Sequence, residues 1–78
     1  MNIHTAMVYV KQGLYVRRPS WGVKFISISQ MENVFLPNIF LTWNDEKGKI
    51  DAGAMFDPDD LAADDWELYT PTHKFFQP

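Results

Sequence analysis

The chain has no cysteine among its 78 residues, and this restricts the ways in which it can be stabilised. Disulfides and cysteine-ligated zinc, the usual supports of very small domains, are excluded. A chain of this length buries only about 60–65% of its unfolded surface, so its own core is marginal. With 46% hydrophobic residues it is nevertheless apolar enough to fold. We therefore expect one domain over residues 1–78, with a core over about 5–70 and a tail over 71–78, that gains stability by associating with further copies.

Local signals divide the chain into short helices and strands. A helix is expected over residues 4–12, with Thr5 as its N-cap and Gly13 just after its end. Five segments that are rich in β-branched and aromatic residues, or that alternate in polarity, are expected to be strands: 14–18, 23–31, 38–44, 49–55 and 66–69. Residues 45–49 indicate a hairpin turn in which Gly48 supplies a positive φ. The expected fold is α+β, a small antiparallel sheet of four to five strands with a short N-terminal helix.

A second short helix is expected before the last strand, on the strength of the sequence DPDD at residues 57–60. Asp57 is a good N-cap, Pro58 suits the first helical position, and the next carboxylates favour the positive end of the helix dipole. This pattern predicts a helix of about two turns through Asp64. A calcium loop is the alternative, but Pro58 and Leu61 interrupt the alternating oxygen ligands that such a loop needs.

Charge is distributed unevenly along the chain. The net charge of −3 disfavours binding to a nucleic acid polymer, because that affinity comes from neutralising phosphates. Six of the ten acidic residues lie within 57–67, whereas five of the seven basic residues precede residue 48. The basic part and the acidic part could pair within one chain or between subunits. No apolar stretch approaches the ~20 residues of a membrane span, and the start lacks a basic leader, so we expect a cytosolic protein without membrane contact.

Patterns typical of catalysis or metal binding are missing from the sequence. The two histidines, His4 and His73, lack a partner at a metal-ligand spacing, and we expect both to be surface groups. The serines lie in no local nucleophile motif, and the four scattered glycines form no phosphate loop. We therefore expect no enzyme activity, no cofactor and no metal.

A binding motif is better supported, because the segment RRPSWG places Arg17 and Arg18 beside Trp21. Arginine offers a planar fork for phosphate, and tryptophan offers a face for a purine or a guanidinium. Neighbouring strand residues point to opposite faces, so only one of the two arginines can face a given site. The alternative is structural and is slightly favoured by the residues alone: one arginine pairs with the acidic helix while Trp21 fills the core. Trp43 and Trp66 also suit a core better than a ligand platform.

Two motifs near the ends of the chain go together in one known family. The first is V-R-R-x-x-W-G at residues 16–22, and the second, which is more specific, is D-L-A-A-D-D-W-E at residues 60–67. Over roughly residues 5–69 the chain resembles the Thoeris anti-defence two family of small phage proteins. Members commonly have a Trp and a Ser-Gln pair before the second motif, where this chain has Ala-Met-Phe-Asp-Pro at 54–58. If the family uses those residues to hold ligand, the pocket or the preferred ligand differs here.

The resemblance implies a phage anti-defence protein that acts as a sponge in the host cytoplasm. Such proteins are homo-oligomers, similar to a dimer of dimers (a tetramer), and they sequester cyclic nucleotide signals of bacterial immunity without cleaving them. The implied ligands are the cyclic ADP-ribose isomers of the Thoeris system and, for some members, cyclic oligonucleotides of the CBASS system.

Candidate ligand-binding residues follow from what a nucleotide site needs. Aromatic side chains would stack on adenine, arginines would hold phosphate, and aspartates would accept hydrogen bonds from ribose hydroxyls. These candidates are Arg17, Arg18, Trp21, Phe25, Trp43, Asp57 and Asp60. The surface of one small chain is too limited to enclose a dinucleotide, so we expect the site at a subunit interface. The basic and acidic motifs would either line this site or pair with each other to form the interface. The alternatives are a phage protein of the same fold that binds a host protein, and an enzyme that cleaves such signals.

Overall fold

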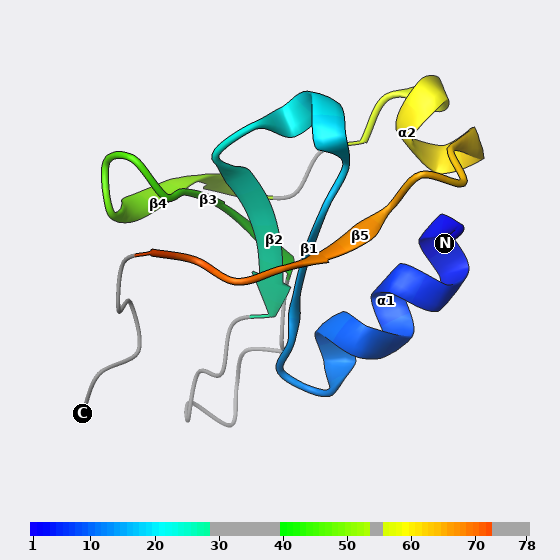
Figure 1. The fold of residues 1–78 in the computed structure, drawn as a ribbon, viewed down its shortest axis with the longest axis horizontal. Coiled ribbons are helices and arrows are strands. Elements are labelled where there is room, and N and C mark those ends of the chain that lie inside the picture. Colours follow the sequence, from blue (N-terminus) through cyan, green and yellow to red (C-terminus); the bar gives the residue numbers. More distant parts are fainter. Residues whose placement is uncertain (29–39, 54–55, 73–78) are drawn as a thin grey trace.

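A computed structural model describes residues 1–28, 40–53 and 56–72 (Figure 1). Within these residues, a five-stranded antiparallel sheet with strand order β4-β3-β2-β1-β5 carries helix α1 against one face. The elements are α1 (Ile3–Lys11), β1 (Tyr15–Arg17), the 3-10 turn η1 (Pro19–Trp21), β2 (Lys24–Ile28), β3 (Phe40–Asn44), β4 (Lys49–Gly53), α2 (Pro58–Ala62) and β5 (Glu67–Tyr69). This arrangement confirms the α+β fold, the N-terminal helix and the short helix before the last strand.

Helix α1 begins earlier than the sequence predicted, because Asn2 rather than Thr5 is its N-cap. The Thr5 amide donates to Oδ1 of Asn2 at 2.8 Å, which places Thr5 inside the first turn. The Thr5 prediction was wrong, and the physical reason is that asparagine is the stronger cap and lies where the helix can start at Ile3. At the other end, Gly13 has φ 92, the positive value that the predicted helix end requires.

The strands of the described residues lie within the predicted segments. Strand β1 ends at Arg17, and Arg18 alone separates the end of the strand from Pro19. The β3–β4 turn contains Gly48 at φ 70, which confirms the predicted hairpin. Parts of three predicted strands lie outside the described residues: 29–31, 38–39 and 54–55.

Helix α2 begins as predicted and ends sooner. Asp57 is its N-cap, and Asp57 and Asp60 form a reciprocal capping box in which each side chain accepts from the other's backbone amide. The helix stops at Ala62 rather than continuing to Asp64, because Ala63 adopts extended backbone at φ −70 and ψ 148. This early stop turns the following residues back toward the sheet.

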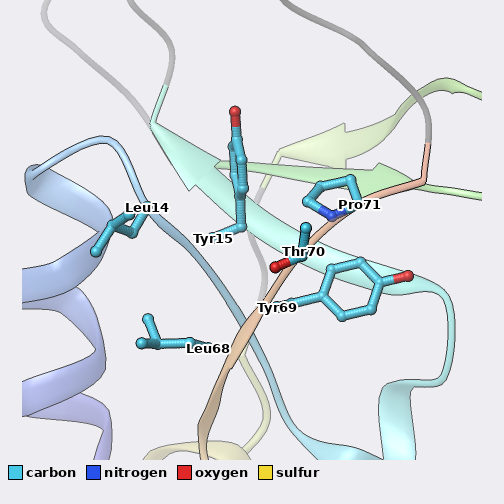
Figure 2. A pocket seen from close by; sticks show the side chains of 6 residues that line it. All are labelled: Leu14, Tyr15, Leu68, Tyr69, Thr70 and Pro71. Atoms are coloured by element: carbon cyan, nitrogen blue, oxygen red, sulfur yellow. The ribbon is translucent and has the colours of Figure 1, made fainter.

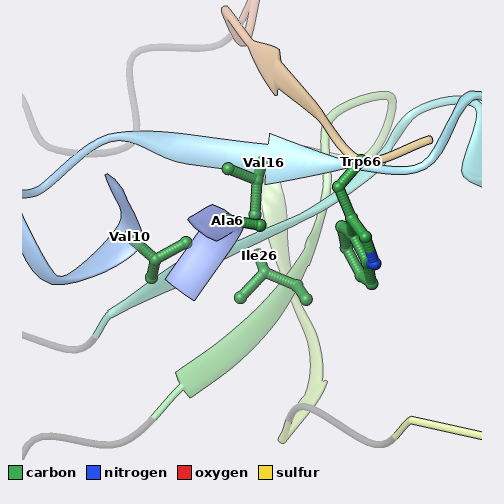
Figure 3. Packing of buried hydrophobic residues seen from close by; sticks show 5 residues of the cluster. All are labelled: Ala6, Val10, Val16, Ile26 and Trp66. Carbon is green, nitrogen blue, oxygen red and sulfur yellow. The ribbon is translucent and has the colours of Figure 1, made fainter. Parts of the chain in front are cut away.

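The hydrophobic core lies between α1 and the face of the sheet that α1 covers (Figure 3). The core cluster consists of Ala6, Val10, Val16, Ile26 and Trp66. The small side chain of Ala6 lets the helix approach β1 and β2, and Trp66, just before β5, closes the end of the core near α2. Among the described residues, no helix has both the length and the apolar character needed to cross a membrane.

Strand β2 is buried on both of its faces. Ile26 is buried on the side that α1 covers, and Phe25 and Ser27 on the opposite side are buried as well. Aromatic rings from neighbouring strands provide this second cover, as described below.

Candidate functional site

The basic and acidic motifs meet in one place, through Arg18. The guanidinium Nε of Arg18 donates to Oδ1 of Asp65 at 2.8 Å, and its Nη1 donates to Oδ1 of Asp60 at 2.9 Å. A third, longer bond joins Nη2 to Oδ2 of Asp65 at 3.4 Å. Because α2 ends early, Asp65 is free to turn toward the arginine. We use the name Arg18 cluster for Arg18, Trp21, Asp60, Asp65 and Trp66.

Asp60 is the hub of the Arg18 cluster, with only 7% of its surface exposed. Its Oδ1 also accepts from Nε1 of Trp21 at 3.4 Å, and its Oδ2 accepts from the Asp57 amide at 3.1 Å. Its backbone carbonyl accepts from Nε1 of Trp66 at 3.0 Å. The two indole rings meet edge to face with centroids 5.1 Å apart. Asp60 therefore ties η1 to α2 through its carboxylate, and ties Trp66 to α2 through its backbone carbonyl.

The electrostatics of this cluster leave little affinity for a phosphate. Burial by itself would raise the pKa of Asp60, but hydrogen bonds from Arg18, the Asp57 amide and Trp21 outweigh it and lower that pKa. The hydrogen bond from Arg18 lowers the pKa of Asp65, and the same contacts raise the pKa of Arg18. At neutral pH the single positive charge of Arg18 is therefore outweighed by the two negative charges of Asp60 and Asp65. The net charge of the three groups is negative and repels an anion.

Arg17 lies in a different environment, because adjacent residues of a strand face opposite ways. Its Nε donates to Oε1 of Glu67 at 3.2 Å, its Nη1 donates to the carbonyl of Gly22, and its guanidinium carbon lies 4.6 Å from the centroid of the Tyr69 ring. The Arg17 side chain is 27% exposed and that of Glu67 is 43% exposed. Such a solvated pair is weak, so Arg17 can exchange its carboxylate for a ligand anion more easily than Arg18 can.

The sheet face opposite α1 is rich in aromatic rings around Phe25. The Tyr15 ring meets Phe25 edge to face with centroids 5.3 Å apart, and the Tyr69 ring lies tilted at the same centroid distance. Trp43 stacks on Phe25 with centroids 6.4 Å apart and 8° between the planes, and its Nε1 donates to the hydroxyl of Ser27. Phe25 has no exposed surface, whereas the outer three rings are partly exposed. We use the name aromatic face for Tyr15, Arg17, Phe25, Trp43 and Tyr69.

The seven residues singled out from the sequence therefore divide into two groups. Arg17, Phe25 and Trp43 belong to the aromatic face. Arg18, Trp21 and Asp60 belong to the Arg18 cluster, and Asp57 caps α2 beside it. For Arg18 and Trp21 this placement favours the structural interpretation.

Sequence reasoning did not select Tyr15 and Tyr69. Their signal is the two-residue period of a strand: Tyr15 lies two residues before Arg17, and Tyr69 lies two residues after Glu67. The strand register confirms this placement, because Tyr15 is opposite Tyr69 and Arg17 is opposite Glu67.

Asp45 fixes the position of Tyr69 and was also missed. This buried carboxylate, in the turn after β3, accepts from the Tyr69 hydroxyl at 2.6 Å and from the amide and hydroxyl of Thr72 at 2.9–3.0 Å. The hydrogen bond to Asp45 is the main cause of a raised pKa for Tyr69, which stays neutral. From the sequence, Asp45 had the appearance of an ordinary hairpin residue.

A small apolar cavity of about 250 Å³ lies at the edge of the sheet formed by β1 and β5 (Figure 2). Its lining residues are Leu14, Tyr15, Leu68, Tyr69, Thr70 and Pro71, and none of these six is charged. The cavity is smaller than the ~300–1,000 Å³ usual for ligand pockets, so it cannot enclose a dinucleotide by itself. No group of three or more residues suited to hold a metal occurs in the part of the chain that the structure describes.

Comparison with known proteins identifies the family. No curated protein matches the chain. The sequence profile of the Thoeris anti-defense 2-like domain matches residues 1–69, a span that includes every described helix and strand and both motifs. The chain belongs to the Thoeris anti-defense 2-like family.

Proposed function

We propose that the protein is a phage sponge, which binds and sequesters a cyclic nucleotide signal of bacterial immunity without cleaving it. Membership of a family described as Thoeris anti-defense supports this role. The proposed ligands are cyclic ADP-ribose isomers, and the cyclic oligonucleotides of CBASS are a second group to test. The protein would act in the cytoplasm of the infected host.

The observation that carries the proposal in this chain is the position of Arg17 over Tyr69. A nucleotide needs a cation for its phosphates and flat surfaces for its bases, and the aromatic face offers both on one side of the sheet. Stacking of a base on an aromatic side chain contributes about 1–3 kcal/mol by analogy with single-strand binders. Arg17 would contact phosphate in place of Glu67, and Trp43, which is partly exposed, would provide a stacking surface.

The Arg18 cluster would serve this site from a distance. By holding η1 and the start of β5 in place, it fixes the two strands that carry Arg17 and Tyr69. A rigid site loses less entropy on binding than a mobile one, so the cluster would raise affinity without touching the ligand.

A sponge also needs enough contact area to compete with the host receptor. An affinity of nanomolar or better, about −12 kcal/mol, is the appropriate scale. The aromatic face of one small chain is open rather than enclosing, so we propose that a homo-oligomer, a dimer of dimers, shares each ligand between copies.

The test is a capture-and-release experiment. Purified protein is mixed with a panel of cyclic ADP-ribose isomers and cyclic di- and trinucleotides, freed of unbound compound by filtration, and heated, and the released material is run on chromatography. We expect one intact compound at near-stoichiometric yield. Arg17→Gln should lose it, and Lys47→Gln, which changes an exposed lysine in the β3–β4 turn, should not.

Two other results would overturn the proposal. Release of a new product with turnover would identify an enzyme. Recovery of every nucleotide in the filtrate would favour the alternative of a phage protein that binds a host protein, to be sought by pull-down from host extract.

A further inference from the structure

The guanidinium of Arg17 is well held but leaves some of its donors unused. Its Nε donates to Oε1 of Glu67 at 3.2 Å, and its Nη1 donates to the carbonyl of Gly22. Its carbon lies 4.6 Å from the centroid of the Tyr69 ring. Nη2 donates to no acceptor among the residues that the structure describes. The N–H groups of Nη2 are therefore available to a further anion.

The Glu67 contact lies at one end of the side of the guanidinium that binds oxyanions best. The N–H of Nε and one N–H of Nη2 point the same way, so together they match two oxygens of a phosphate or carboxylate. Glu67 bonds to Nε alone and thus holds this side at one point rather than two. A phosphate that bonds to both nitrogens would take the place of Oε1 of Glu67. It would displace the carboxylate and make one more hydrogen bond than the carboxylate does.

The two other contacts of Arg17 do not depend on Glu67. Gly22 has φ 63 and ψ −113, a backbone conformation that suits glycine, and in this conformation its carbonyl accepts from Nη1. The Tyr69 ring is held by the hydrogen bond from its hydroxyl to Asp45 at 2.6 Å. The guanidinium would therefore stay in position when Glu67 leaves, with Nε and Nη2 ready for a ligand.

Glu67 can move its carboxylate, but it cannot move far from Arg17. Its side chain is 43% exposed and accepts from Arg17 alone among the described residues. Its backbone lies directly opposite Arg17 in the β1–β5 pair. A displaced carboxylate would remain beside the bound anion and repel it. Glu67 thus opposes an anion twice, first as a competitor for Nε and then as a neighbouring like charge.

We propose that Glu67 is an internal competitor that limits the affinity of Arg17 for anions, so that the site is autoinhibited in the free protein. The contact favours a phosphate that bonds to both Nε and Nη2 over a simple ion such as chloride, which can replace the carboxylate at one point only. The inference rests on the proposed function for the identity of the natural ligand. Inorganic phosphate tests the contact without that ligand.

The first experiment is a phosphate titration followed by the NMR signal of the Arg17 Nε–H group, which is identified by its loss in Arg17→Gln. The ionic strength is kept constant at about 0.15 M, so that distant charges are screened. Glu67→Gln removes the charge and keeps the shape of the side chain. We expect its dissociation constant for phosphate to be about fivefold lower than that of the wild type, the effect of one unit charge about 4 Å away in water.

The matched control is Glu46→Gln, the same substitution at an exposed glutamate in the β3–β4 turn. It should leave the dissociation constant unchanged, because it removes the same charge from a residue that makes no contact with Arg17. Circular dichroism checks that each variant is folded.

A second measurement uses the wild-type protein alone. Phosphate should shift the Arg17 Nε–H signal and the side-chain carboxylate carbon of Glu67 with the same dissociation constant, because one event moves both. The carbonyl carbon of Gly22 should not shift, since its bond to Nη1 persists. A Glu67 signal that stays constant while Arg17 responds would show that phosphate does not displace the carboxylate, and the inference would then be wrong.

The remaining outcomes separate this inference from the proposed function. Equal phosphate affinity in the wild type and folded Glu67→Gln, or no response of Arg17 in that variant, would overturn the inference even if the wild type captures a nucleotide. Tighter phosphate binding by Glu67→Gln, with no nucleotide captured by either protein, would leave the inference standing and reject the proposed function.

Discussion

Nη1 of Arg18 lies 2.9 Å from Oδ1 of Asp60, and this ion pair joins two motifs that are 42 residues apart in the sequence. The neighbouring Arg17 instead lies over Tyr69 on the opposite side of the strand. Two adjacent arginines thus have separate tasks. Arg18 joins η1 to the acidic segment, and Arg17 is the cation that we propose for ligand binding.

Asp60 is expected to be the most important acidic residue for stability. Asp60→Ala removes the acceptor shared by Arg18, Trp21 and the Asp57 amide, and we expect it to lower the free energy of unfolding by about 2–3 kcal/mol. Urea denaturation followed by tryptophan fluorescence measures this loss. Asp59→Ala, an exposed neighbour in the same turn, should change it by less than about 0.5 kcal/mol. Equal effects of the two substitutions would contradict the role of Asp60 as the hub.

Substitution of Arg17 should affect ligand capture, whereas substitution of Arg18 should affect stability. Arg17→Gln is expected to weaken nucleotide capture by about tenfold or more, the scale of one charge-assisted hydrogen bond, with little change in the urea midpoint. Arg18→Gln is expected to lower the urea midpoint, because Asp60 and Asp65 then face each other without a cation. Capture and denaturation measured on both variants decide the matter. A normal capture by stable Arg17→Gln would show that the phosphate contact lies elsewhere.

Stability should fall in acid because of the Arg18 cluster. Asp60 and Asp65 have pKa values below their ordinary ones in the folded chain, so the unfolded chain binds protons first as the pH falls. Their contribution is complete above the unfolded value of about 3.9 and is lost as the pH drops through the lower folded values. The urea midpoint should therefore be steady above about pH 5 and decrease below about pH 4. In Asp65→Asn the decrease should be smaller, and an unchanged slope would argue against this assignment.

Asp45 should control the ionisation of Tyr69. The carboxylate accepts a hydrogen bond from the Tyr69 hydroxyl and so raises the pKa of this tyrosine. In Asp45→Asn, the pKa of Tyr69 should decrease toward its usual value, and Thr72 should lose a charged acceptor. An alkaline titration followed by tyrosinate absorbance detects the change. Tyr69→Phe in the same background identifies the signal, and an Asp45→Asn curve identical to the wild type would refute the link.

Much of the fold was predictable because its signals are local. The capping box at Asp57, the turn at Gly48 and the period of the strands each act within a few residues. The cap at Asn2 was missed because Asn2 and Thr5 are both good capping residues and lie close together. Which of them caps the helix depends on the residue at which the helix begins.

The candidate site was predictable only in part, because its parts come from distant segments. The sequence could show that one arginine faces each side of the sheet, but not which of them the acidic segment would pair with. That choice depends on the point at which α2 ends and Asp65 turns back, which is decided by tertiary contacts. The hydrogen bonds from Thr72 to Asp45 could not be predicted for the same reason, because they join segments that are distant in the sequence.

The final prediction concerns Trp43 and Trp21, because substituting them tests the aromatic face and the Arg18 cluster independently. Trp43 is partly exposed on the aromatic face, so Trp43→Ala should remove a stacking surface and reduce nucleotide capture by about tenfold, at ~1–3 kcal/mol per stacked base. Trp21 packs on Trp66 and donates to Asp60, so Trp21→Ala should lower the urea midpoint instead. Capture is measured at a temperature where both variants are folded by circular dichroism. If Trp21→Ala abolished capture while Trp43→Ala retained it, the ligand would bind beside the Arg18 cluster, and the division of labour between Arg17 and Arg18 would have to be reversed.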